Sequence, residues 1–108
     1  MDLMNELQQK IKELEISIKQ LRTSGTKYAQ AERDYKVLLR VEVLKLRDEG
    51  QAIGVIDKIC YGIPEVAEAR FKRDVAKAVY TANLEAINSI KLQMRLLESQ
   101  IQREYGSN

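Results

Sequence analysis

Few side chains in this 108-residue sequence could carry out covalent or acid–base chemistry. There is no histidine and one cysteine, Cys60, which excludes a histidine-based acid–base site, a catalytic triad and the common zinc sites. With no histidine to activate it, Cys60 is better interpreted as an apolar thiol in a small core. Carboxylate pairs such as Glu32 with Asp34 and Glu65 with Glu68 are too common on charged helices to indicate catalysis. We therefore expect no enzyme activity, no metal ion and no cofactor.

Basic side chains offer a different chemistry, the binding of phosphate groups. The candidates for contact with nucleic acid or a partner are Lys36, Arg40, Lys45, Arg47, Arg70, Arg73 and Lys77. Carboxylates occur in the same part of the chain, and the net charge is only +2, so an ordinary solvated face is the competing interpretation.

Two heptad patterns predict the helices that must position these residues. Apolar residues recur at alternating spacings of three and four near both ends of the sequence. The two seams consist of Leu7, Ile11, Leu14, Ile18 and Leu21, and of Ile87, Ile90, Met94, Leu97 and Ile101. Low aromatic content (6%) and one proline also favour an all-α protein over a β-sandwich or barrel.

Glycine and proline mark where the helices are expected to end. The sequence Thr23-Ser24-Gly25-Thr26 predicts a break, with Gly25 just beyond a helix C-terminus. Gly50 and Gly62 flank a short apolar segment, and Pro64 suits the first turn of a helix that meets no further glycine or proline until residue 106. The expected helices are 2–23, 27–49, 52–60 and 64–105.

A single fold brings both seams together. If the chain turns back near Gly54, position i faces roughly position 108 − i, and the two seams come into register. We therefore predict one domain, residues 1–108, built as a long antiparallel helical hairpin with a kinked first arm, a short tip helix and a last helix of about 40 residues. Off-seam residues such as Ile16, Leu44 and Leu92 lack a partner, which favours a homo-oligomeric, multi-helix coiled-coil bundle. The arms could pair within or between subunits.

The middle of this hairpin is polar. The same pairing places Tyr28 opposite Tyr80 and Tyr35 opposite Arg73, with Glu32 nearby. One interpretation is a partly buried network that fixes the register of the helices. The other is a binding site for a partner or a phosphate group.

The expected tip of the hairpin is apolar and could bind a protein partner. Its candidate contact residues are Ile53, Val55, Ile56, Ile59 and Tyr61.

The compartment follows from cysteine usage and hydropathy. One cysteine is typical of a reducing cytosol. The first ten residues lack the pattern of a signal peptide, and no apolar run approaches the roughly 18 residues of a membrane span. We expect a cytoplasmic protein with no membrane contact and no small-molecule substrate.

The segments 29–50 and 66–106 together resemble a known group of small helical proteins. This group comes from the early, recombination and replication region of phages and prophages of Gram-positive bacteria. The resemblance implies a bacterial host cell, and a role in assisting DNA metabolism or in disabling host proteins. It brings no established active site.

Three hypotheses follow from these observations. The first is a non-enzymatic accessory of phage DNA recombination or replication that oligomerises and contacts single-stranded DNA or its binding proteins. The alternative is an inhibitor of a host or anti-phage defence protein, similar to an anti-CRISPR factor, that acts by steric binding. A structural coiled-coil scaffold is the third.

Overall fold

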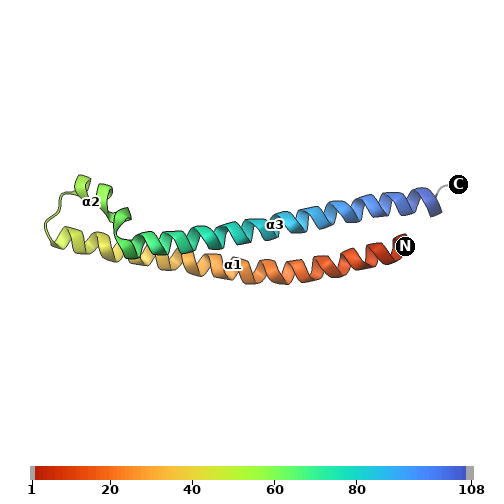
Figure 1. Ribbon diagram of the computed structural model, residues 1–108, viewed down its shortest axis with the longest axis horizontal. Helices are drawn as coiled ribbons and strands as arrows, with labels where there is room; N and C mark the ends of the chain where they lie inside the picture. Colours follow the sequence, from red (N-terminus) through yellow and green to blue (C-terminus); the bar gives the residue numbers. More distant parts are fainter. Residues whose placement is uncertain (1, 107–108) are drawn as a thin grey trace. The chain divides into compact units, whose positions relative to one another are not determined.

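The computed structural model describes residues 2–106, and every regular element in that range is helical. Helix α1 spans Leu3–Asp48, α2 spans Ile53–Ile59, a short 3₁₀ helix η1 spans Cys60–Gly62, and α3 spans Pro64–Tyr105 (Figure 1). The predicted all-α class is confirmed. No helix in this range is both long and apolar enough to cross a membrane.

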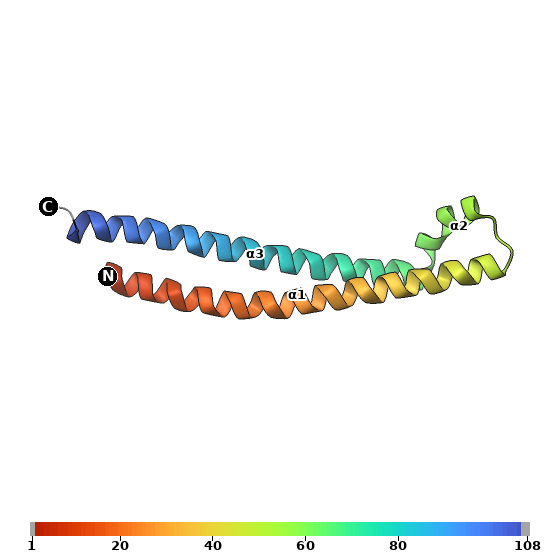
Figure 2. The same cartoon turned by 180° about the vertical axis from the view of Figure 1, so that it is seen from behind.

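The chain forms two compact units. The terminal unit comprises residues 2–24 and 80–106, and the turn unit comprises residues 25–79. In each unit, a segment of α1 lies beside an antiparallel segment of α3 in both views (Figures 1 and 2). The predicted hairpin pairing therefore occurs within the chain.

The predicted helix break at Thr23–Thr26 is wrong, because α1 continues through it. Two hydroxyls of this segment bond backwards into the helix: Thr23 Oγ1 donates to the Lys19 carbonyl and Ser24 Oγ to the Leu21 carbonyl, each at 3.2 Å. Gly25 keeps a helical backbone within α1. It does not adopt the positive φ of a helix C-cap glycine, which among the described residues occurs at Gly50. A glycine inside a helix costs only about 1 kcal/mol, which packing along the rest of α1 offsets.

In the terminal unit the heptad seams face each other. Ile87 is buried, and the other seam residues are half-buried except Ile11, which is exposed. Asn83 Nδ2 donates to Ser24 Oγ at 2.7 Å, one residue from the predicted opposition of positions 83 and 25. This bond satisfies the buried Ser24 hydroxyl and fixes the register of the two helices.

The end of α1 is set by Gly50. Its φ is +84°, a value that glycine adopts without strain. The Gly50 amide donates to the Arg47 carbonyl at 2.9 Å, and the Gln51 amide donates to the Leu46 carbonyl at 3.1 Å. These two bonds form a Schellman motif, which satisfies the last carbonyls of α1 and turns the chain towards α2.

The turn unit has a small apolar core where α2 and η1 meet the start of α3. Ile56, Cys60 and Val66 are buried, and Val66 is fully inaccessible. Ile56 and Cys60 are four residues apart and so lie on one side of the short helical segment. Pro64 begins α3, as predicted, and the Ala67 amide donates to the Ile63 carbonyl at 2.9 Å to start its first turn.

Candidate nucleic-acid interface

A polar cluster joins α1 to α3 in the turn unit. The Arg73 guanidinium lies over the ring of the buried Tyr35, 4.7 Å from its centroid, so the predicted opposition of these residues is confirmed. Glu32 Oε1 lies 3.8 Å from Arg73 Nη1 and 3.7 Å from Lys36 Nζ. Arg73 Nε also donates to Asp74 Oδ1 at 2.8 Å. The Glu32 carboxylate therefore bridges one cation from each helix and places Lys36 and Arg73 on the same face.

Other basic residues extend this face along both helices. At about 100° per residue, Lys36, Arg40 and Arg47 fall within an arc of roughly 40° on α1. On α3, the side chains of Arg70, Arg73 and Lys77 fall within an arc of roughly 60°. We call these six residues the basic face: Lys36, Arg40, Arg47, Arg70, Arg73 and Lys77.

Several basic-face cations are available to a ligand. Arg40, Arg47 and Lys77 are exposed, and the described residues supply none of them with an ion pair. The Arg70 guanidinium lies 5.5 Å from the ring centroid of Tyr61, whose side chain remains half-exposed. The face thus combines free positive charge with an accessible aromatic ring.

Lys45, the seventh predicted binding residue, is separated from the other six. It lies roughly 140° around α1 from Arg40 and pairs with Glu42 at 3.3 Å. Lys45 is close to the others along the chain but not around the helix, so its position in the sequence alone does not separate it from them.

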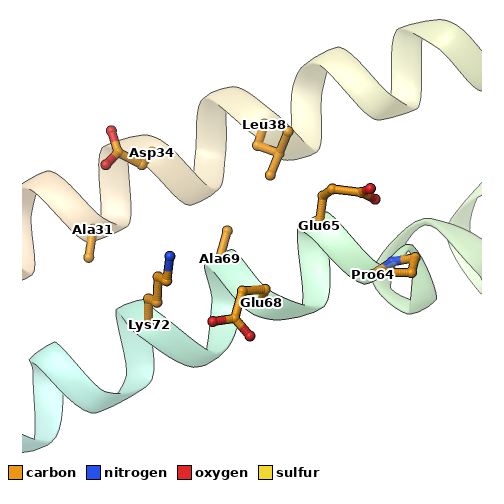
Figure 3. Close-up of a pocket in the computed structure, with 8 residues that line it drawn as sticks. All are labelled: Ala31, Asp34, Leu38, Pro64, Glu65, Glu68, Ala69 and Lys72. Carbon is orange, nitrogen blue, oxygen red and sulfur yellow. The ribbon is translucent and has the colours of Figure 1, made fainter.

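The opposite side of the turn unit carries an acidic groove. Its volume is about 500 Å³. Ala31, Leu38 and Ala69 point into the space between α1 and α3 (Figure 3). The remaining lining residues are Asp34, Pro64, Glu65, Glu68 and Lys72. None of the six basic-face residues lines this groove, so the turn unit has two faces of opposite charge.

Four of the five residues of the predicted tip surface are exposed, and one is buried. Ile53 is 69% exposed, and Val55, Ile59 and Tyr61 are also exposed. Ile56 is only 3% exposed, because the helical period turns it towards Cys60 and the start of α3. It belongs to the core and cannot contact a partner without unfolding α2.

The division of charge between the two faces was not predicted from the sequence. Carboxylates between positions 32 and 74 argued against a basic surface. Asp34, Glu65 and Glu68 lie in the groove on the other side, whereas Glu32 and Asp74 pair with Arg73 on the basic face. The helical period, combined with antiparallel pairing of the two helices, separates these charges into two faces and could have predicted the division. The predicted Tyr28–Tyr80 opposition spans the two units and stays a prediction.

Comparisons with known proteins add no family assignment: neither the family models, the curated proteins nor the solved structures contain a match to this chain. Within residues 2–106, no group of three or more Cys, Asp or Glu side chains is arranged to hold a metal ion.

Proposed function

We propose that this protein is a non-enzymatic accessory of phage DNA recombination or replication that binds single-stranded DNA through the basic face. The observation that carries this proposal is the sorting of charge in the turn unit. Six cations lie on one side, and the carboxylates of the groove lie on the other. The resemblance to early-region phage proteins supplies the biological context.

The dimensions of the basic face suit a flexible, phosphate-bearing strand. Along the paired helices, Lys77 and Arg47 are roughly 24 Å apart at 1.5 Å per residue. Proteins that bind single strands without sequence preference combine such a basic track with aromatic rings on which bases stack. Tyr61, whose ring lies beside the Arg70 guanidinium, would supply the aromatic ring on which a base stacks.

Charge reversal on the two faces tests the proposal. The variant R40E/R47E changes the basic face, and K45E/K72E makes the same change in net charge on the other side. In fluorescence anisotropy with labelled single-stranded DNA, we expect R40E/R47E to weaken binding by about 10- to 100-fold. The control variant should weaken it by less than about threefold. Circular dichroism checks that both variants remain helical.

Equal losses in the two variants would overturn the proposal, because they would show that net charge alone attracts the DNA. Unchanged binding by R40E/R47E would overturn it as well.

Exposed apolar residues at the tip favour a second candidate, the inhibition of a host or defence protein by steric binding. Ile53 and Ile59 are exposed on α2 with no neighbour to bury them. The variant I53D/I59D should then lose a partner in a pull-down from bacterial lysate while keeping its DNA binding. The variant R40E/R47E should show the opposite pattern. Capture that is unchanged in I53D/I59D would contradict this candidate.

A further inference from the structure

An apolar stripe runs along α1 on the side away from its buried face. Val37, Val41 and Leu44 follow the spacing of four and three residues that is typical of a helix-packing seam. Their exposed fractions are 59%, 42% and 44%. The stripe lies roughly half a turn from the buried Tyr35. The helix therefore has two apolar sides in the turn unit, and α3 covers only one of them.

Arginines flank this stripe at every seventh position. Arg33, Arg40 and Arg47 occupy the place beside a seam that selects partners by charge. Two copies of the stripe placed against each other would bring these arginines together, and like charges at such positions oppose association. The stripe instead suits an apolar surface with an acidic border.

The acidic groove of the turn unit has this character. Its floor is formed by small and apolar side chains, and its border carries Asp34, Glu65 and Glu68 against one ammonium group, that of Lys72 (Figure 3). The space lies between two helices, where a third helix packs in a bundle.

We propose that the stripe of one copy docks in the acidic groove of a second copy of this chain. Val37, Val41 and Leu44 would cover the groove floor, and Arg40 and Arg47 would meet Glu65 and Glu68. The contact joins two different surfaces and is therefore heterologous, so each copy keeps a free stripe or groove for the next one. The proposal builds on the self-association expected from the sequence; it shares Arg40 and Arg47 with the basic face but does not require DNA.

Complementary charge reversal tests this docking in the absence of DNA. Analytical ultracentrifugation of the wild-type chain should show association that increases with concentration and weakens with salt. Each of the variants R40E/R47E and E65K/E68K should weaken association at least about tenfold. Mixing the two should restore it, because the intact stripe of E65K/E68K then faces the intact groove of R40E/R47E, and the reversed stripe faces the reversed groove.

A matched control is available in the terminal unit, which has a groove of about 450 Å³ with Glu6 and Glu13 among its lining residues. The variant E6K/E13K makes the same change of charge and should associate like the wild type. Loss of association in this control, or a mixture of the two reversed variants that stays dissociated, would overturn the proposal. Association that is unchanged in E65K/E68K would do so too.

Failure of this docking and failure of the proposed function can be told apart. The variant E65K/E68K keeps the basic face, so it should bind single-stranded DNA while remaining dissociated. A wild-type chain that associates as described but binds no DNA would overturn the proposed function alone. The substitution V41D places a charge in the apolar stripe itself. Introduced into every chain, it should abolish association in both the wild-type and the mixed experiment.

Discussion

The two units use the same pair of helices differently. In the terminal unit, apolar seams face each other and one hydrogen-bonded pair, Asn83 with Ser24, fixes their register. In the turn unit, the apolar core is confined to the region around Ile56 and Val66, and a polar cluster centred on Arg73 joins the helices. The terminal unit buries its apolar residues between the two helices, whereas the turn unit divides its charges between two faces. The difference separates the part that holds the hairpin together from the part that we propose to bind.

The largest expected effect is at the core of the turn unit. Ile56→Ala should lower the free energy of unfolding by about 2–4 kcal/mol, because it leaves a cavity at a buried position. Ile53→Ala, on the same short helix, should change it by less than about 0.5 kcal/mol, since Ile53 is exposed. Urea denaturation measures both. Similar values for the two variants would show that the turn unit has no core of its own.

The polar cluster should contribute less. Arg73→Ala removes the ion pairs to Glu32 and Asp74 and uncovers the ring of Tyr35, at an expected cost of about 1–2 kcal/mol. Lys77→Ala, one turn further along α3, is the control and should be nearly neutral. High salt should reduce the effect of Arg73→Ala only in part, because the contact with the ring persists. If the Arg73→Ala variant were as stable as the control, the polar cluster would not stabilise the fold.

In the terminal unit, Asn83→Ala should cost about 1 kcal/mol, the typical net contribution of one hydrogen bond, while the Ser24 hydroxyl keeps its bond to the Leu21 carbonyl. Asn88→Ala lies on the same helix at an exposed position and should leave stability unchanged. Thermal unfolding followed by circular dichroism would show a midpoint lowered by about 4–8 °C for Asn83→Ala alone. Equal midpoints would mean that the apolar seams fix the register without the polar pair.

The smallest effects concern two glycines of the turn unit. Gly54 lies within α2, and no atom lies within 4 Å of the place where a Cβ would stand, so Gly54→Ala should stabilise the protein by about 0.5 kcal/mol. Gly50→Ala should destabilise it by about 1 kcal/mol, because its φ of +84° is strained for alanine. Chemical denaturation would give the two changes opposite signs. The same sign for both would contradict the helix ends described for α1 and α2.

Much of the fold was predictable because it rests on spacing. Heptad periods gave the seams, Pro64 the start of α3, and Gly50 the end of α1. The continuity of α1 was not predictable, because Ser24 and Thr23 are as suited to capping a helix as to bonding back into it. The contact of Ser24 with Asn83, 59 residues further along the chain, favours the continuous helix.

The candidate site was predictable in its residue types but not in its arrangement. Six of the seven basic residues share a face, and Lys45 does not, a distinction that needs both the angle around α1 and the position of α3. For the same reason Ile56 was expected at the surface: an apolar residue in a short helix reveals which side it faces only when its neighbours are placed.

The salt dependence of DNA binding tests the central claim most directly. Fluorescence anisotropy of the wild-type chain with single-stranded and double-stranded DNA, across a series of salt concentrations, gives the number of phosphates contacted. If four to six basic-face residues meet phosphates, the logarithm of the binding constant for single strands should fall with a slope of about −3 to −4 against log salt. Single strands should also bind more tightly than duplex. No binding at low salt, or binding that does not change with salt, would contradict the account.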